Sequence, residues 1–384
     1  MNDMNMEFKD PFEHIASRRP LIMAGPCSAE TREQTLNCAL RLSEGGIRIY
    51  RAGIWKPRTH PGGFEGIGKV GLDWLREVKE KTGMMTATEV ATREHVAEAL
   101  QAGVDILWIG ARTTANPFAV QEIAEAVASI SPETPVLVKN PVNPDLELWI
   151  GALERLYKAG VTRLGAIHRG FSTYGENRYR NAPVWQIPTD LRVRFPTLKI
   201  LHDPSHTGGD ANLIESLSRR AMRMGFDGLI IESHPDPSAA WSDARQQITP
   251  ETLLDFLPRL PHSSDPARTP ADKLGELRGQ IDSIDHRLLK LLGERMQISR
   301  RIGEIKGENG IPVVQPQRFA SLLDDRTERG AELGLSPEFV RRMMKAIHYE
   351  SVDQQLPPRI QPSDAPTHSK DTFPGTEQTK SLSE

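Results

Sequence analysis

Eight short apolar segments recur along the first 235 residues of the chain, rich in Val, Ile and Leu and without polar alternation. Such segments are typical of strands that are buried on both faces of a parallel sheet. We predict strands over 21–24, 47–52, 84–89, 106–110, 136–139, 163–168, 199–202 and 228–232. The chain is therefore predicted to be an α/β protein.

Between most of these segments, apolar residues recur every three or four positions, which indicates amphipathic helices. We predict helices over 31–43, 69–81, 92–102, 117–129, 145–159 and 211–224, and an irregular connection over 170–196. Eight strands that alternate with helices favour a closed (β/α)8 TIM barrel over an open sheet. Catalytic groups of such barrels lie at the carboxyl ends of the strands.

The pattern changes after residue 260. Apolar residues from Leu277 to Ile305 alternate in spacings of four and three, which predicts one long packed helix over 271–308. Such a helix is about 55 Å long. The two shorter helices predicted over 315–333 and 337–355 cannot cover it, so we expect an all-α second domain that forms a dimer.

These patterns divide the chain into five segments. They are an N-terminal extension, the barrel, a linker rich in proline and small polar residues, the helical domain and a disordered tail, over 1–17, 18–260, 261–271, 272–356 and 357–384.

Composition narrows the possible partners. The net charge is −3 and the pI is about 6.4, so the chain has no global basic field for nucleic acid or an anionic membrane. It has only two cysteines and no apolar run near 18 residues. We therefore expect a cytoplasmic protein that binds small molecules.

A polar residue lies at or just after the end of each of the eight predicted strands. In order these residues are Cys27, Arg51, Glu89, Arg112, Lys139, Arg169, His206 and Glu232. Any one of them alone could be a solvated strand end, but eight together predict a functional site at the barrel mouth.

Four of the nearby side chains could hold a metal ion. Cys27, His206 and Glu232, together with Asp243 after the eighth strand, offer S, N, O and O donors. This mixed set suits one divalent ion of Mn, Fe, Zn, Co or Cu without selecting among them. His202 and His234 are rival imidazoles, but strand alternation points them away from the other donors.

Basic residues gather at the same strand ends. Six lie near the strands and two more on the connection after the sixth strand: Arg51, Lys56, Arg58, Arg112, Lys139, Arg169, Arg178 and Arg180. Arginine forks match phosphate and carboxylate oxygens, and so many buried like charges require anions. At least one phosphorylated, carboxylate-bearing substrate is expected.

Several motifs make a family resemblance specific. They are GPCS at 25–28, KPRT at 56–59, GAR at 110–112, HRG at 168–170, DPSH at 203–206, IIESHP at 230–235 and AWSD at 240–243. In these motifs the barrel resembles 3-deoxy-D-arabino-heptulosonate 7-phosphate (DAHP) synthase of the shorter microbial type. That enzyme joins phosphoenolpyruvate to erythrose 4-phosphate at the start of the shikimate pathway.

The resemblance implies a role for each site residue. It assigns the metal to Cys27, His206, Glu232 and Asp243, phosphoenolpyruvate to Arg51, Lys56, Arg112, Lys139 and Arg169, and erythrose 4-phosphate to Arg58 and Thr59. Lys56 is a candidate proton donor to the developing alkoxide, and His168 is a candidate for managing the water.

Two alternatives remain for the barrel. One is 3-deoxy-D-manno-octulosonate 8-phosphate synthase, which uses arabinose 5-phosphate, although KPRT at 56–59 argues against it. The other is a class I aldolase with Lys139 as the Schiff-base amine.

The helical segment carries a second site. Arg295 occupies an otherwise aliphatic seam and Lys306 lies eleven residues further on, which favours a dicarboxylate ligand. The segment resembles the all-helical chorismate mutases, and the matching residues are Arg278, Arg295, Lys306, Arg318, Ser351 and Gln355. The resemblance implies rearrangement of chorismate to prephenate without a cofactor, with Lys306 and Gln355 at the ether oxygen. It also implies a homodimer, or a tetramer, in which Arg278 serves the partner's site.

Two positions depart from the common mutase pattern. Gln315 stands where an aspartate is frequent, and Phe319 stands where a glutamate usually contacts the substrate hydroxyl. Turnover is then expected to be weak, or the domain to be a sensor that binds prephenate or chorismate and inhibits the barrel.

Overall fold

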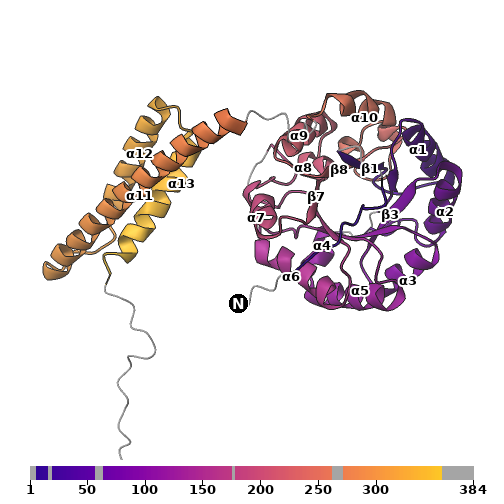
Figure 1. Cartoon of the computed structure of the whole chain (residues 1–384), viewed down its shortest axis with the longest axis horizontal. Helices are drawn as coiled ribbons and strands as arrows, with labels where there is room; N and C mark the ends of the chain where they lie inside the picture. Colours follow the sequence, from indigo (N-terminus) through magenta and orange to yellow (C-terminus); the bar gives the residue numbers. More distant parts are fainter. Residues whose placement is uncertain (1–5, 16–19, 57–63, 175–177, 262–270, 357–384) are drawn as a thin grey trace, which may run out of the picture. The chain divides into compact units, whose positions relative to one another are not determined.

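The computed structural model describes residues 6–15, 20–56, 64–174, 178–261 and 271–356. Eight parallel strands form a closed barrel in sequence order, with helices around it (Figure 1). The strands are β1 (Leu21–Gly25), β2 (Ile49–Arg51), β3 (Met85–Val90), β4 (Ile106–Ile109), β5 (Val136–Lys139), β6 (Leu164–His168), β7 (Lys199–His202) and β8 (Gly228–Glu232). The predicted TIM barrel is confirmed, and each strand ends within two residues of its predicted bounds.

The helices of the barrel follow the strands. They are α1 (Arg32–Glu44), α2 (Val70–Thr82), α3 (Arg93–Gln101), α4 (Ala111–Thr114), α5 (Pro117–Ile130), α6 (Leu146–Lys158), α7 (Gln186–Arg194), α8 (Pro204–Gly208), α9 (Ala211–Arg223) and α10 (Pro250–Phe256). Three 3-10 turns complete the barrel: η1 (Pro237–Ala239), η2 (Ala244–Gln246) and η3 (Leu257–Arg259). Thr31, Thr92 and Asp145 cap their helices by accepting a hydrogen bond from a backbone N–H of the first turn. The connection over 170–196, predicted to be irregular, contains α7.

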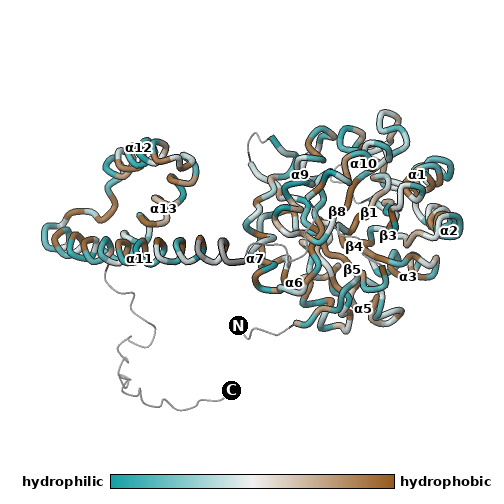
Figure 2. The backbone as a smooth tube through the Cα atoms, turned by 45° about the horizontal axis from the view of Figure 1, so that its top comes forward, coloured by the Kyte–Doolittle hydropathy of each residue, from teal (hydrophilic) through white to brown (hydrophobic). Residues whose placement is uncertain are grey.

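Apolar side chains form two layers around the strands. The outer layer lies between the strands and the helices, and the inner layer fills the barrel with residues such as Met23, Trp108 and Ile230. Figure 2 shows the hydrophobic strands at the centre of the more polar ring of helices. Phe12 belongs to the inner layer, so the segment predicted only as an extension contributes to the barrel core.

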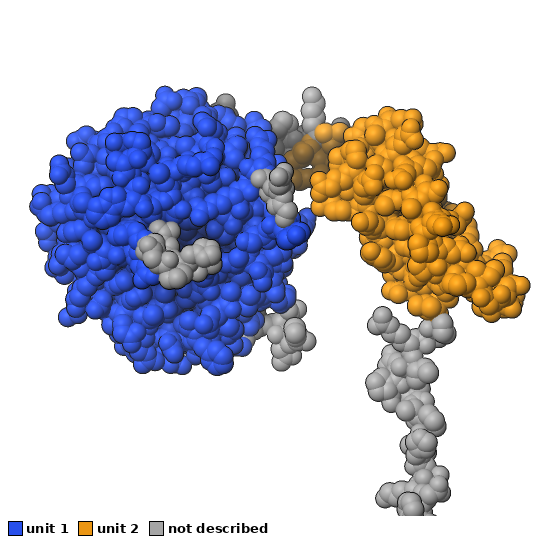
Figure 3. Space-filling view, turned by 180° about the vertical axis from the view of Figure 1, so that it is seen from behind, with its two compact units in different colours: residues 1–267 blue, residues 268–384 orange. Residues whose placement is uncertain are grey.

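The chain divides into two compact units, residues 1–267 and 268–384 (Figure 3). The second unit contains α11 (Ala271–Glu308), α12 (Pro316–Glu332) and α13 (Pro337–Asp353). The long helix predicted over 271–308 is confirmed. The tail predicted to be disordered lies outside the described residues.

The long helix leaves its apolar seam largely exposed. Leu277, Ile281, Leu291 and Ile305 are each more than half exposed. Among the described residues, no helix is long and apolar enough to cross a membrane.

Candidate functional site

Strand pairing brings the first and last segments of the barrel together. β1 pairs with β8, and Gly25 lies opposite Glu232. Gly25 has a φ of 150°, and a Cβ there would lie 2.1 Å from the carbonyl oxygen of Arg51. Only glycine fits this close approach, which carries the chain from β1 to Cys27 at the barrel mouth.

The four predicted metal ligands lie as two pairs. Cys27 Sγ lies 3.1 Å from Asp243 Oδ2, and His206 Nε2 lies 3.6 Å from Glu232 Oε1. Within the described ranges, no three His, Cys, Asp or Glu side chains are arranged to enclose a metal ion.

A cation lies beside each of these two pairs of predicted ligands. The Lys56 amine contacts the Cys27 thiol and donates to the Cys27 carbonyl oxygen at 3.1 Å. Arg51 donates to Glu232 Oε1 at 3.0 Å, and both side chains are almost fully buried. The carboxylates are therefore balanced by positive charge within the protein.

Burial and these charges set the protonation of the ligands. Burial, with a further contribution from Glu232, raises the pKa of Cys27 to about 12. Burial alone would raise the pKa of Glu232, but His206 and Arg51 lower it to about 2. Lys56 and Arg180 likewise overcome burial and lower the pKa of Asp243. The site therefore holds two carboxylates and a thiol.

The donor set fits a divalent metal. His206 Nδ1 lies 2.8 Å from Asp203 Oδ2, while Nε2 faces Glu232. A carboxylate behind the imidazole is a common support for a metal-bound histidine. Two carboxylates, this imidazole and the Cys27 thiol, which can lose its proton to a metal, offer four donors of suitable chemistry.

The predicted anion-binding cations surround the same mouth. Lys139 pairs with Asp203 at 3.0 Å, and both are buried. The ring of Trp108, also buried, lies beneath Arg51 and Lys139, with its centroid 4.9 and 5.9 Å from their charged groups. Trp108 was not predicted as a site residue, because its apolar strand gave no signal beyond burial.

Two arginines complete this part of the mouth. Arg169 donates to Asn181 Oδ1 at 2.8 Å, and burial lowers its pKa to about 10. Arg112 is exposed, and its positive charge acts on Arg169. Like charges gathered in this way, with burial disfavouring the charge of Arg169, favour an anionic ligand.

The structure places His168 in an aromatic cluster. Its Nε2 lies 2.7 Å from the carbonyl oxygen of Pro183, and its Nδ1 lies 3.1 Å from His202 Nδ1. Burial, with the neighbouring His202, holds the pKa of His168 well below its usual range. Both ring nitrogens already have partners, so the ring as it lies here is not poised to exchange a proton with a substrate. The rival His234 faces Glu30 at 3.4 Å.

The erythrose 4-phosphate residues predicted from KPRT, Arg58 and Thr59, lie outside the described residues. Arg178 and Arg180, predicted on the loop after the sixth strand, line a pocket of about 780 Å³ beside Asp243. Arg180 donates to Asp243 Oδ1 at 2.9 Å.

Two buried glutamines tie the ligand segments together. Gln247 accepts a hydrogen bond from the Cys27 backbone N–H at 2.9 Å and donates to the Ser242 carbonyl at 2.8 Å. Gln246 donates to Glu232 Oε2 at 2.6 Å. Sequence reasoning missed both, because nothing in a glutamine pair after the last strand marks a site.

Asp243 itself has a left-handed backbone, with a φ of 51°. Aspartate tolerates this region better than most residues, but it is uncommon. The hydrogen bonds of Gln247 and of Ser242, whose Oγ lies 2.7 Å from Ser28 Oγ, hold this turn in place.

The helical unit assembles part of the predicted chorismate site. Arg295 donates to the Ser351 hydroxyl, Gln355 donates to the Ser351 carbonyl at 2.9 Å, and Lys306 donates to the Val313 carbonyl at 2.7 Å. The predicted residues Arg278, on α11, and Arg318, on α12, are exposed.

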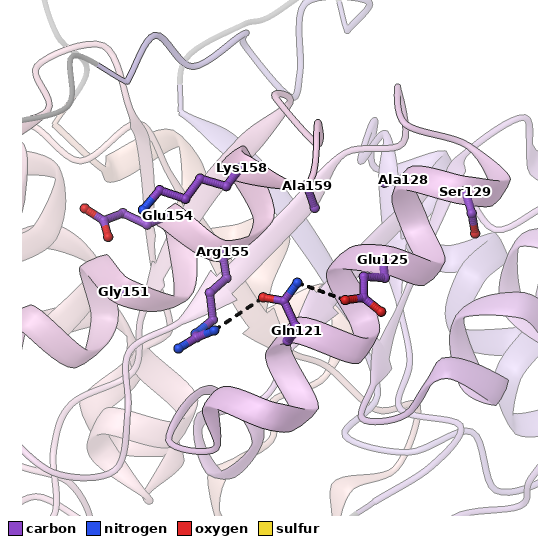
Figure 4. A pocket seen from close by; sticks show the side chains of 9 residues that line it. All are labelled: Gln121, Glu125, Ala128, Ser129, Gly151, Glu154, Arg155, Lys158 and Ala159. Carbon is purple, nitrogen blue, oxygen red and sulfur yellow. Dashed lines mark hydrogen bonds between the residues drawn. The ribbon is translucent and has the colours of Figure 1, made fainter.

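A separate pocket of about 610 Å³ lies between α5 and α6 (Figure 4). Its polar groups bond to one another: Gln121 donates to Glu125 at 3.1 Å and accepts from Arg155 at 3.3 Å. None of the predicted site residues lines it.

The closed barrel gathers cations, carboxylates, an imidazole and a thiol at its mouth, an arrangement typical of barrel enzymes. Residues 13–265 match the DAHP synthetase I family, and residues 277–356 match chorismate mutase type II. The chain belongs to the DAHP synthetase I family and carries a chorismate mutase domain at its C-terminal end. It is a bifunctional enzyme, as the resemblance implied.

Similar proteins support the family assignment of the barrel. A phospho-2-dehydro-3-deoxyheptonate aldolase of Thermotoga maritima is 33% identical over 244 residues, which cover 64% of this chain and 70% of the relative. A crystal structure of that aldolase has a TM-score of 0.56 at 33% identity and covers 66% of this chain and 69% of its own.

A second group of relatives has a different name. A 2-dehydro-3-deoxyphosphooctonate aldolase of Geobacter sulfurreducens is 29% identical over 266 residues, which cover 64% of this chain and 92% of the relative. These proteins correspond to the octulosonate alternative considered above.

Proposed function

We propose that the barrel is a metal-dependent DAHP synthase that joins phosphoenolpyruvate, erythrose 4-phosphate and water to give DAHP and phosphate. The observation that carries this proposal is that two pairs of potential metal donors, Cys27 with Asp243 and His206 with Glu232, lie at the barrel mouth with the buried cations Arg51 and Lys139. The Lys56 amine contacts the Cys27 thiol and lies 3.8 Å from Asp243 Oδ2.

Arg51, Arg112, Lys139 and Arg169, with Lys56, would hold the phosphate and carboxylate of phosphoenolpyruvate. Arg51 and Lys139 are fixed by Trp108 and by their acidic partners, so little side-chain entropy is lost when the ligand binds. Arg58 and Thr59 would hold the phosphate of erythrose 4-phosphate.

The chemistry requires one carbon–carbon bond and one carbon–oxygen bond to form and one carbon–oxygen bond, to the leaving phosphate, to break. C3 of phosphoenolpyruvate attacks the aldehyde carbon of erythrose 4-phosphate, water adds to C2, and phosphate leaves with the bridging oxygen. Lys56 would donate a proton to the aldehyde oxygen as that oxygen gains charge. A divalent metal bound by the four donors would supply Lewis-acid polarisation of that aldehyde.

For His168, predicted as a candidate for managing the water, we propose a supporting role. Its ring is held between Pro183 and His202, and it packs against Phe171 and Trp185. It fixes the end of β6, from which Arg169 extends into the mouth.

The substrate is tested by product analysis. Purified protein is given phosphoenolpyruvate with erythrose 4-phosphate or with arabinose 5-phosphate. DAHP from the first pair supports the proposal, whereas an octulosonate from the second pair alone supports the alternative of the second group of relatives.

A class I aldolase is disfavoured by the ion pair of Lys139 with Asp203, because a buried, paired ammonium is a poor nucleophile. Loss of activity with EDTA and no trapping by borohydride are the expected results. Borohydride trapping on Lys139 would support the Schiff-base alternative.

For the helical unit we propose the rearrangement of chorismate to prephenate, without a cofactor. Arg295 and Lys306 would bind the two carboxylates of the substrate, with Arg318, Ser351 and Gln355 beside them, and Lys306 and Gln355 would donate to the ether oxygen. A second copy would cover the exposed seam of α11 and supply Arg278, as a homodimer or as part of a tetramer. Prephenate formation by the full chain, and a dimer in sedimentation, test this.

We also propose that prephenate or chorismate bound to the helical unit inhibits the barrel. This rests on the fusion of the two activities in one chain and on the departures at Gln315 and Phe319, which favour a sensing role. Inhibition of DAHP formation by added prephenate tests it. An Arg295→Ala variant should lose that inhibition and keep its barrel activity.

A further inference from the structure

Phe319 on α12 and His348 on α13 form a stacked pair in the helical unit. Their ring centroids lie 3.8 Å apart, with an angle of 16° between the planes. His348 lies one helical turn before Ser351, on the same face of α13. Ser351 accepts a hydrogen bond from Arg295, so the stack adjoins the proposed chorismate contacts.

The His348 ring lies in a positively charged surrounding. It is half-buried, and burial together with the charges of Arg295 and Lys306 lowers its pKa. The imidazole is therefore neutral at neutral pH, with one N–H donor and one nitrogen acceptor. The same cations would hold the carboxylates of the substrate, so the ring stands at the edge of that ligand.

Chorismate carries, besides two carboxylates, a hydroxyl that both donates and accepts hydrogen bonds. Arg295 and Lys306 can only donate. Phe319 presents an apolar ring, and its stack fixes the orientation of His348.

We infer that His348 is a substrate-binding residue of the helical site and makes the hydrogen bond to the ring hydroxyl of chorismate, with Phe319 as its platform. The inference rests on the proposed mutase function. It assigns to an imidazole on α13 the polar contact that the apolar residue at 319 cannot make.

The test measures kcat and KM for chorismate in the full chain, with DAHP formation as a check of folding. His348→Leu should lower kcat/KM about tenfold, mainly through KM, because one hydrogen bond to the bound ligand is lost. His348→Asn, which keeps a donor and an acceptor, should stay within about threefold of the parent. His286→Leu, at an exposed histidine of α11, is the matched control and should have no effect.

A double substitution tests whether the stacked pair lies where the substrate hydroxyl binds. Phe319→Glu combined with His348→Leu puts a hydrogen-bonding carboxylate where the stack now lies and should recover part of the lost affinity. Equal KM values for His348→Leu, His286→Leu and the parent would overturn the inference.

Failure of the proposed function gives a different result. If the parent binds chorismate in equilibrium dialysis but does not convert it, the mutase proposal fails, and the same variants are compared by their dissociation constants. If the parent neither binds nor converts chorismate, both proposals fail.

Discussion

The barrel and the helical unit differ in how complete a site one chain can build. In the barrel, Arg51, Lys139 and Glu232 are almost fully buried and paired within the chain. In the helical unit, Ile281 and Leu291 of the α11 seam are 56% and 61% exposed. The barrel closes its site by joining its own first and last strands, whereas we propose that a second copy covers the apolar face of the helical unit.

The largest expected effect is on the chemistry of the barrel site alone and leaves the helical site unchanged. Cys27→Ala should lower DAHP formation by about a thousandfold, because a proposed metal ligand is lost and each 1.4 kcal/mol of barrier is a factor of ten. Chorismate conversion should not change. Cys38→Ala, at the other buried cysteine, is the control. Full DAHP-forming activity of the Cys27 variant would contradict the proposed metal site.

The next largest effect tests whether the helical site, unlike the barrel site, depends on a dimer. Ile284→Arg places a charge on the exposed apolar seam and should weaken the dimer by at least about a hundredfold, because a buried unpaired charge is costly. Chorismate conversion should then fall with dilution in step with the loss of dimers seen by sedimentation. His286→Arg, off the seam, should change neither. A monomeric variant with full mutase activity would contradict the need for a partner.

A smaller effect tests how the barrel fixes its ligands. Gln247→Glu removes the N–H donated to the Ser242 carbonyl and should weaken Mn²⁺ binding about 10- to 100-fold, the usual loss for groups that support metal ligands. Equilibrium dialysis of metal-free protein measures this without turnover. Gln121→Glu, between α5 and α6, is the matched control. Unchanged Mn²⁺ affinity in the Gln247 variant would show that the turn at Asp243 keeps its conformation without this hydrogen bond.

The smallest effect concerns acid stability. Burial lowers the pKa of His202 to about 4, from an ordinary 6.5. Between these values the unfolded chain binds a proton that the folded barrel does not, so the free energy of unfolding falls as pH drops from about 6.5 towards 4. The slope is up to about 1.4 kcal/mol per pH unit for each such imidazole, and buried His168 adds to it.

Tryptophan fluorescence can isolate this effect in the barrel. All six tryptophans precede residue 242, so urea unfolding followed at their emission reports the barrel alone. The predicted unfolding free energy is lower at pH 4.5 than at pH 6.5. Equal stability at the two values would mean that the buried histidines accept protons in the folded state.

The strand pattern and the strand-end residues were predictable from the sequence because both follow from local composition. A parallel strand buried on both faces is a continuous apolar run, and the barrel topology then places its carboxyl end at the mouth. Cys27 and Glu232, 205 positions apart, could be expected to meet for this reason alone.

Residues that act through long-range contacts were not predictable. Gln247 reaches the backbone of Cys27 across 220 positions, and Phe12 enters the barrel core from a segment that resembles an ordinary extension. Their roles depend on tertiary contacts, which a single sequence does not encode locally.

The most direct test of the bifunctional account is one experiment with the full chain. Protein is incubated with phosphoenolpyruvate and erythrose 4-phosphate, or with chorismate, each with and without EDTA, and the products are identified. The account predicts DAHP only without EDTA, and prephenate in both conditions. DAHP formation that survives complete removal of metal, or prephenate formation that is lost with it, would contradict the division of chemistry between the barrel and the helical unit.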